Sequence, residues 1–235
     1  MFKNKVCVIT GGANGIGKAI SDEFKNNNAK CYIIDIVKGD HFVGDISDKE
    51  TLEKFVKYVI EKEGKIDFLI NNAPPIMKGI DDCSYEEFNK ALSVGVTAPF
   101  YLSKLFLPYF NDNSCIINIS SSRDRMSQPQ TESYTASKGA ISALTHALAI
   151  SLSHKIRVNS ISPGWINTVS DFVGDESDNL QHPSGKIGHP NDIAKLVLFL
   201  CSEDASFING ENICVDGGMT KQMIYHNDYN WILKK

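Results

Sequence analysis

The chain has 235 residues, 42% of them hydrophobic and 22% charged, and its formal net charge is −4 at pH 7. This composition suits one large domain with a sizeable core, and the balanced charge without a basic block argues against nucleic acid as the principal partner. The six cysteines are scattered, without a C-x-x-C pair or a Cys/His cluster, so we expect reduced thiols, no metal site and a cytoplasmic protein.

The first predicted element is a short β-branched strand at residues 5–10, which leads into the glycine turn G-G-A-N-G-I-G and then a helix to about residue 26. Strand, glycine turn and helix in this order are the context that a dinucleotide-binding loop needs. Gly11 permits the tight turn, Gly15 lets the backbone approach a pyrophosphate, and Gly17 lets the helix pack close to the strand.

The second predicted strand, residues 30–36, places Asp35 near its end, eighteen residues after Gly17. A carboxylate at this point can accept hydrogen bonds from both ribose hydroxyls of an adenosine, and it repels a 2′-phosphate. Asn14 brings no positive charge to the loop that would offset a phosphate. We therefore expect NAD as the cofactor, with Lys38 as the nearby cation that would reverse the preference toward NADP.

A third predicted strand, residues 41–46, follows after only about five residues, which is too short for a crossover helix. The second βαβ unit is therefore predicted to have lost its helix. Asp45, near the end of this strand, can contact the adenine amino group or cap the helix predicted at residues 47–63, for which Ser47 and Asp48 are alternative caps.

The fourth predicted strand, residues 65–73, ends near Asn71 and Asn72, and the Pro74-Pro75 pair then forces a loop. Two predicted helices lack a fully polar face: Ala91–Phe110, with a break at Pro99, and Tyr134–Leu152. This suggests that the sheet covers one side of each helix and a second subunit covers the other. We expect a homodimer or homotetramer through these helices. Their apolar stretches fall short of a membrane span, so we expect no membrane partner.

Tyr134 and Lys138 are four residues apart on a predicted helix, so they share one face. An ammonium on that face would stabilise the phenolate and lower the tyrosine pKa from about 10, which would make Tyr134 a usable general acid or base. The apolar strand at residues 115–119 ends in three serines, and a hydroxyl at that end of a strand can hold a substrate oxygen.

The last third of the sequence supplies two more predicted strands, at residues 156–161 and 212–215. The polar segment from Val169 to Lys186 has no clear periodicity, and we predict a lid over the site. The helix at residues 193–201 is expected to be capped by Asn191. The aromatic tail, residues 219–235, is expected to pack on the body or on a neighbouring subunit.

Strands and helices alternate along the chain, which predicts a Rossmann-type doubly wound parallel sheet of about seven strands with helices on both faces. The helix between the second and third strands would be missing. We expect a single dinucleotide-binding catalytic domain over residues 1–218, with every candidate group at the C-terminal ends of strands.

The sequence resembles the short-chain dehydrogenase/reductase family over roughly residues 3–218. The matching motifs are, in order, T-G-G-A-N-G-I-G at residues 10–17, Asp35, N-N-A at 71–73, I-S-S at 119–121, Y-T-A-S-K at 134–138, P-G-W-I-N-T at 163–168 and V-D-G-G at 215–218. The resemblance implies an NAD(P)-dependent alcohol dehydrogenase or carbonyl reductase that acts on a small secondary alcohol or ketone, with the hydride carried by the cofactor.

The resemblance also implies the roles of individual residues. Tyr134 matches the family's acid/base, Lys138 the residue that lowers its pKa and holds the nicotinamide ribose, and Ser121 the hydroxyl that polarises the substrate. The cofactor is expected to bind Gly11, Asn14, Gly15, Ile16, Gly17, Asp35, Asp45, Ile46, Asn72, Ala73, Tyr134, Lys138, Pro163, Gly164 and Ile166. Walls of the substrate pocket are expected from residues that include Met77, Arg123 and Trp165.

Several alternatives stay open on the sequence alone. Arg123 or Arg125 can fix a substrate carboxylate, lie in a solvated loop or pair with Asp124. Gly95 stands where the family usually has an Asn, and Pro74 where it usually has a Gly. These two departures motivate a second hypothesis, in which the protein is a catalytically impaired nucleotide-binding regulator or scaffold of the same fold.

Overall fold

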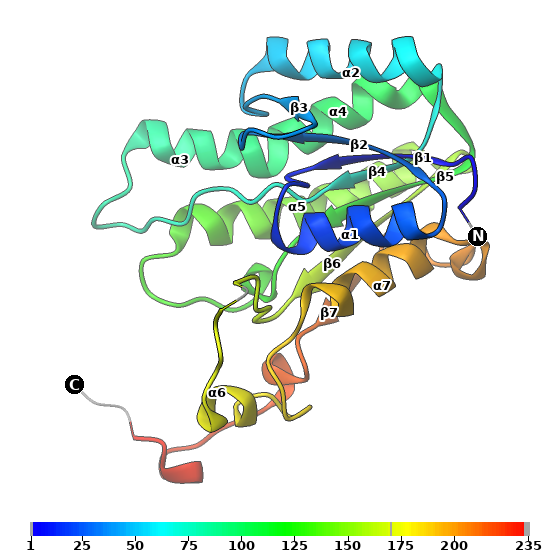
Figure 1. Ribbon diagram of the computed structural model, residues 1–235. Helices are drawn as coiled ribbons and strands as arrows, with labels where there is room; N and C mark the ends of the chain where they lie inside the picture. Colours follow the sequence, from blue (N-terminus) through cyan, green and yellow to red (C-terminus); the bar gives the residue numbers. More distant parts are fainter. Residues whose placement is uncertain (1, 170, 233–235) are drawn as a thin grey trace.

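The computed structural model describes residues 2–169 and 171–232. Its centre is a sheet of seven parallel strands in the order β3-β2-β1-β4-β5-β6-β7. The predicted Rossmann-type architecture is therefore confirmed (Figure 1). The strands are β1 (Val6–Thr10), β2 (Lys30–Asp35), β3 (Phe42–Val43), β4 (Ile66–Asn71), β5 (Phe110–Ile119), β6 (Ile156–Pro163) and β7 (Asn212–Val215).

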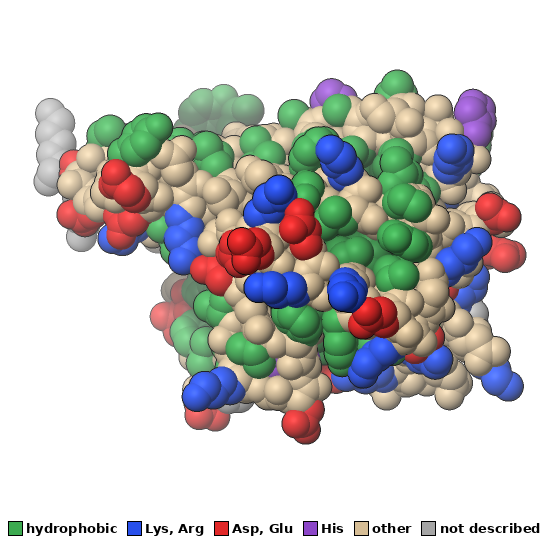
Figure 2. Space-filling view, turned by 90° about the horizontal axis from the view of Figure 1, so that it is seen from above, with side chains coloured by type: hydrophobic (Ala, Val, Ile, Leu, Met, Phe, Trp, Pro, Cys, Tyr) green, Lys and Arg blue, Asp and Glu red, His purple; other side chains and the backbone are tan. Residues whose placement is uncertain are grey.

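Helices cover both faces of the sheet because each strand carries apolar side chains on both sides. Helices α1 (Gly15–Asn26) and α7 (Pro190–Cys201) pack on one face. On the other face lie α2 (Lys49–Glu63), α4 (Ala98–Phe106) and the end of α5 (Glu132–Ser151). Charged side chains of both signs are mixed over the outer surface on the α2 side, with apolar side chains between them (Figure 2).

The connection between β2 and β3 contains no helix, as predicted from its length. β3 is shorter than expected, with two residues, and pairs with the end of β2 through Ile34–Phe42 and Asp35–Val43. The chain turns away after Gly44 because Asp45 accepts hydrogen bonds from both the amide and the hydroxyl of Ser47. The carboxylate of Asp48 then caps α2, which settles the open question of its cap.

Pro99 does not break the helix in which it lies. Helix α3 (Tyr85–Leu92) continues through a π-helical turn, Ser93–Thr97, into α4, and Pro99 occupies the first turn of α4. The π-helical turn supplies the irregular backbone that a proline, which has no amide hydrogen, requires. Among the described residues, one helical stretch, Tyr85–Tyr109, passes a membrane-span test by length and composition, but α4 within it packs against α2 and the sheet.

One expectation in the last third of the chain needs correction. Helix α7 begins at Pro190, and its cap is His189, whose ring nitrogen accepts from the amide of Asn191, so the prediction of Asn191 as the cap was wrong. The predicted lid is partly ordered into helix α6 (Glu176–Leu180). The segment is also joined to the loop after β7, because the Ser184 amide donates a hydrogen bond to the Gly217 carbonyl at 2.9 Å. Ser170, within this segment, lies outside the described residues.

The tail projects from the body beyond α6 as far as it is described (Figure 1). Its large side chains are exposed, with Tyr225 at 67%, Tyr229 at 81% and Trp231 at 46% of their free surface. In a single chain, therefore, most of this aromatic surface remains open to solvent.

Candidate active site

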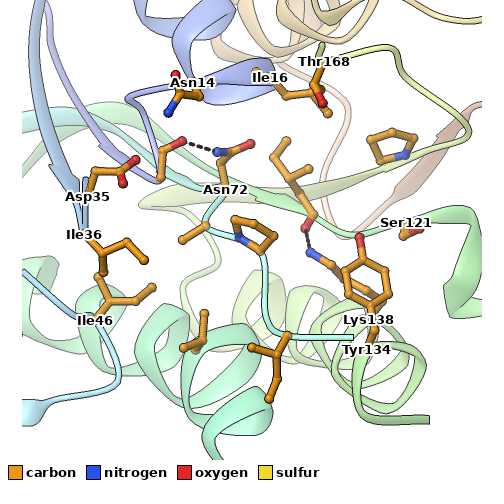
Figure 3. A pocket seen from close by; sticks show the side chains of 18 of the residues that line it. Asn14, Ile16, Asp35, Ile36, Ile46, Asn72, Ser121, Tyr134, Lys138 and Thr168 are labelled. Carbon is orange, nitrogen blue, oxygen red and sulfur yellow. Dashed lines mark hydrogen bonds between the residues drawn. The ribbon is translucent and has the colours of Figure 1, made fainter. Parts of the chain in front are cut away.

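A cavity of about 700 Å³ opens at the C-terminal ends of the strands. Asp35, Ile36 and Ile46 lie toward one end, and Ser121, Tyr134 and Lys138 toward the other (Figure 3). The lining residues are Gly11, Asn14, Gly15, Ile16, Ile34, Asp35, Ile36, Val37, Gly44, Asp45, Ile46, Asn72, Ala73, Pro74, Ile76, Lys90, Val94, Ile119, Ser120, Ser121, Tyr134, Lys138, Pro163, Gly164, Ile166 and Thr168.

The glycine loop after β1 is shaped by close backbone packing. Gly11 has φ +66°, and a methyl group placed on it would lie 2.6 Å from the Cα of Ala73. Asn72 donates its side-chain amide to the carbonyl of Gly11, 2.8 Å, so it holds the loop against β4. Gly17 does not line the cavity but lies beneath the loop, where a side chain would run into the Gly11 carbonyl and the Asn72 amide.

The N-terminus of α1 faces this cavity without a cap of its own. Asn14 stands at the N-cap but its side chain makes no capping hydrogen bond, and the first turn contains no acidic residue. The first amides of a helix have no partner within it, and their positive end attracts anions. The loop is therefore suited to a phosphate or pyrophosphate group.

Asp35 lies at the tip of β2, with its carboxylate beside the loop. One oxygen accepts from the amide of Ala13 and the other from the amide of Val37, both at 3.0 Å. These two contacts fix the orientation of the carboxylate, and each oxygen still has a lone pair for another donor.

Asp45 and Lys90 form an ion pair of 2.9 Å on the wall of the same cavity. Burial opposes ionisation of Asp45, but hydrogen bonds from Ser47 and Lys90 prevail and hold the pKa of this carboxyl below its ordinary value. The carboxylate thus stays charged near neutral pH. Lys90 comes from α3, so the pair joins that helix to the loop after β3.

Lys138 donates its ammonium to the carbonyl of Ile119 at 2.7 Å and lies 5.3 Å from the centre of the Tyr134 ring. Burial lowers the pKa of Lys138 to about 8. The pKa of Tyr134 is raised, chiefly because the phenol is buried, although a hydrogen bond with Ser121 and the charge of Arg123 oppose this. The expected lowering of the tyrosine pKa is therefore not found in this structure, because burial of the phenol outweighs the groups that oppose it.

Met77, Arg123 and Trp165 lie outside the lining of the cavity. Trp165 packs instead against the rings of Phe172 and His182, with centroid separations of 5.8 and 6.2 Å. Ile76, which the sequence also suggested as a pocket wall, does line the cavity. Residues that sequence reasoning missed as site residues include Lys90, Val94 and Thr168. Lys90 and Val94 lie on one helical stretch, and no sequence signal indicated that their side chains reach the cavity.

The two arginines of the segment after β5 have different partners. Arg125 pairs with Asp124 through two nitrogens, at 2.8 and 3.0 Å, as one of the open alternatives anticipated. Arg123 donates one nitrogen to the side chain of Gln128, while its Nη1 atom is buried and makes no hydrogen bond. Within residues 2–169 and 171–232, His, Cys, Asp and Glu side chains form no cluster of three suited to a metal ion.

A family model described as Enoyl-(Acyl carrier protein) reductase matches residues 11–220. An uncharacterized oxidoreductase of Thermotoga maritima is 39% identical over 255 residues, and the alignment covers 96% of this chain and 99% of the relative. The chain belongs to the short-chain dehydrogenase/reductase family.

Two further family relatives bear on structure and activity. A solved SCOR enzyme from Clostridium thermocellum superposes with a TM-score of 0.92 at 46% identity, with 99% of each chain covered. The NADP-dependent (R)-specific alcohol dehydrogenase of Lentilactobacillus kefiri is 33% identical over 251 residues, covering 94% of this chain and 98% of the relative.

Members of the short-chain dehydrogenase/reductase family use NAD or NADP, and this cavity fits such a dinucleotide. The uncapped amides of α1 suit the pyrophosphate, and Asp35 suits a ribose. A methyl group on Gly15 would lie 3.1 Å from the Thr168 side chain, so only glycine leaves this part of the cavity open.

Both departures from the family pattern lie in the cavity or directly beside it. Pro74 lines it directly. Gly95 is buried in the π-helical turn, where a methyl group would lie 2.8 Å from the Cβ of Ser137 and 3.3 Å from Pro75. Glycine therefore lets this turn pack directly against α5, the helix that carries Tyr134 and Lys138.

Proposed function

We propose that the protein is an oxidoreductase that transfers a hydride between NAD(H) and a secondary alcohol or its ketone, with Tyr134 as the general acid/base. The observation that carries this proposal is the meeting of Ser121, Tyr134 and Lys138 at one end of the cavity whose other end contains Asp35. A nicotinamide cofactor, when bound, supplies the hydride. The chain must then supply orientation and a proton.

Ser121 and Tyr134 can share the handling of the substrate oxygen. The Ser121 hydroxyl accepts a hydrogen bond from the Arg123 amide at 3.2 Å, so its own proton points away from the turn and can pass from the Tyr134 oxygen to a carbonyl oxygen when a substrate binds. The raised pKa of Tyr134 keeps the phenol protonated at neutral pH, which suits it to donate a proton as a carbonyl is reduced. Alcohol oxidation, which needs the phenolate, should accelerate as the pH rises.

We propose NAD over NADP because Asp35 would face a 2′-phosphate with a like charge. The named relative from Lentilactobacillus kefiri is NADP-dependent, so both cofactors belong in the assay. The apolar side chains of Ile76 and Val94, which line the cavity, favour a bulky or ring-shaped alcohol.

We further propose that the enzyme is a cytoplasmic homo-oligomer. All six cysteines are free thiols, which suits a reducing compartment. The helices proposed to form the interface expose apolar side chains, among them Phe100 at 46% and Ile150 at 75% of their free surface. The alternative of an impaired regulator has less support, because Gly95 and Pro74 leave the three proposed catalytic side chains in place.

The proposal is tested with purified protein, NAD or NADP, and a panel of secondary alcohols, hydroxy acids and sugars, read at the absorbance of the reduced cofactor. We expect turnover with NAD. We expect Tyr134→Phe to lower kcat by about 10²–10⁴-fold, the usual contribution of a positioned acid/base. The dissociation constant for NADH, measured by fluorescence titration, should be unchanged.

Tyr58→Phe is the matched control, since the Tyr58 hydroxyl contacts Lys62 on α2 at 3.0 Å, outside the lining of the cavity. It should leave kcat unchanged. Turnover that survives Tyr134→Phe would contradict the acid/base assignment. Tight binding of NADH without turnover of any compound in the panel would instead favour the regulator.

A further inference from the structure

Asp124 carries a buried carboxylate in the short 3₁₀ turn Ser122–Asp124 that follows the proposed catalytic Ser121. Its side chain retains only 5% of its free surface. The carboxylate does not line the cavity, so no substrate or cofactor explains it.

The carboxylate joins four separate elements of the fold. Its Oδ2 atom accepts hydrogen bonds from the hydroxyls of Ser142 on α5 and Ser162 on β6, both at 3.1 Å, and from the side-chain amide of Asn212 on β7. Arg125 pairs with both carboxylate oxygens from the turn itself. A single side chain therefore anchors the turn after β5 to one helix and two strands.

These contacts also keep the carboxylate charged. Burial opposes ionisation, but hydrogen bonds from Arg125 and Ser162 prevail, so the pKa of Asp124 lies below its ordinary value. A buried charge is costly unless it is paired and fully hydrogen-bonded. The charged carboxylate of Asp124 therefore fixes the positions of Arg125, Ser142, Ser162 and Asn212, which all donate to it.

The network reaches the proposed catalytic residues on two sides. In the turn, the Asp124 amide donates to the Ser121 carbonyl at 2.9 Å. On α5, Ser142 lies one turn after Lys138, and its single hydroxyl proton goes to Asp124. The Ser120 hydroxyl, which follows β5, donates to the carbonyl of Lys138 at 2.9 Å. Asp124 is thus one hydrogen bond from Ser121 and one from Ser142, a neighbour of Lys138 on the same helix.

We propose that Asp124 is a positioning residue, which fixes the Ser121 turn against helix α5 so that Ser121 and Tyr134 face the same substrate oxygen. This inference rests on the proposed function, in which both hydroxyls act on that oxygen. Displacement of a reacting group by about 1 Å can cost about 100-fold in rate, so a mobile turn is expected to impair the chemical step.

A purely structural role is the competing explanation, and Asp67 is its matched control. Asp67 has a similarly buried side chain, with 3% of its free surface exposed, and accepts from the Val6 amide, Lys5 and Asn111. It lies near the start of β4, at the opposite end of the strands from the cavity. Asp124→Asn and Asp67→Asn therefore both remove one buried, hydrogen-bonded charge, but only the first touches the turn.

Steady-state kinetics and amide hydrogen exchange are measured on wild type and on both variants below their unfolding temperatures. We expect Asp124→Asn to lower kcat by about 10–100-fold, in the range of a misplaced group, with KM and NADH affinity within about 3-fold of wild type. Exchange should accelerate at the amides of Arg123 to Met126. Asp67→Asn should lower the unfolding temperature but leave kcat and this exchange unchanged.

An Asp124→Asn variant with wild-type kcat, or an equal loss of kcat in both variants, would overturn the inference. If Asp124→Asn does not fold, Ser162→Ala removes a single donor and should show the same effects, smaller in size. If wild type turns over no compound in the panel, the proposed function fails, and hydrogen exchange still decides the inference: unchanged exchange at the Ser121 turn overturns it.

Discussion

The Lys138 ammonium is buried and donates to a backbone carbonyl, and burial lowers its pKa to about 8. In the unfolded chain a lysine keeps its proton up to about pH 10.4. Between these two values the unfolded state therefore binds more protons than the folded state, and stability must rise with pH. Below about pH 8 both states are charged and this contribution is constant.

We predict that the unfolding free energy of wild type rises relative to that of Lys138→Met from about pH 8 to about pH 10. The slope of this difference is expected to be at most about 1.4 kcal/mol per pH unit. Urea titrations at several pH values measure this difference, and contributions from all other groups largely cancel in it. Lys155→Met, at an exposed lysine, is the control for the loss of a charge. A difference that stays constant over this interval would show that Lys138 keeps its proton.

The sequence located the two residues but not the direction of their side chains. A spacing of four residues on a helix correctly placed Tyr134 and Lys138 at one cavity. It did not reveal that the ammonium turns to the carbonyl of Ile119, because that contact depends on where β5 ends relative to α5. The direction of the tyrosine pKa shift was wrong because the fold buries the phenol, which the spacing of two residues does not reveal.

At the scale of elements, the π-helical turn at Ser93–Thr97 has a specific sequence requirement. Gly95 packs against Ser137 of α5, where a methyl group would lie 2.8 Å from a Cβ that is fixed by its own helix. We predict that Gly95→Ala lowers the unfolding free energy by about 1–3 kcal/mol, the usual cost of overpacking a filled site. Urea denaturation measures the change, with one shared value for the dependence of unfolding free energy on urea concentration in wild type and variant.

Gly139→Ala provides the contrast within α5. A methyl group there would meet nothing closer than the Asp124 carbonyl at 4.0 Å, and alanine is the better helix former by about 1 kcal/mol. This variant should be slightly more stable than wild type. If Gly95→Ala were stabilising to the same degree, the turn would have room for a side chain, and packing would not explain the glycine.

Loop length proved a better guide to the elements than local residue preference. The absence of a helix between β2 and β3 followed from too few residues to form a crossover, and the structure confirms it. Pro99 was interpreted as a break, although the π-helical turn before it allows the helix to continue. The cap of α7 was misplaced because Pro190 fits the first helical position, which moves the cap back to His189.

At the scale of the whole molecule, the parallel sheet and the two helical layers follow from alternating strands and helices, so the order of elements in the sequence was sufficient to predict them. The walls of the substrate pocket could not be predicted in this way. They come from loops such as the one that places Trp165 on Phe172 and His182, and their course depends on tertiary contacts.

The apolar residues left exposed on α4 and α5 lead to a prediction about assembly. Phe100 on α4 is 46% exposed, and Phe207, on the loop between α7 and β7, is fully exposed. We predict that wild type sediments as a dimer or tetramer and that Phe100→Glu shifts it to a smaller species, because a charge in the apolar core of an interface is unfavourable. Phe207→Glu introduces the same charge outside the proposed interface and should leave the size of the oligomer unchanged. Sedimentation velocity at several concentrations measures the size of wild type and of both variants. A monomeric wild type, or a Phe100→Glu variant of unchanged size, would contradict the proposed interface.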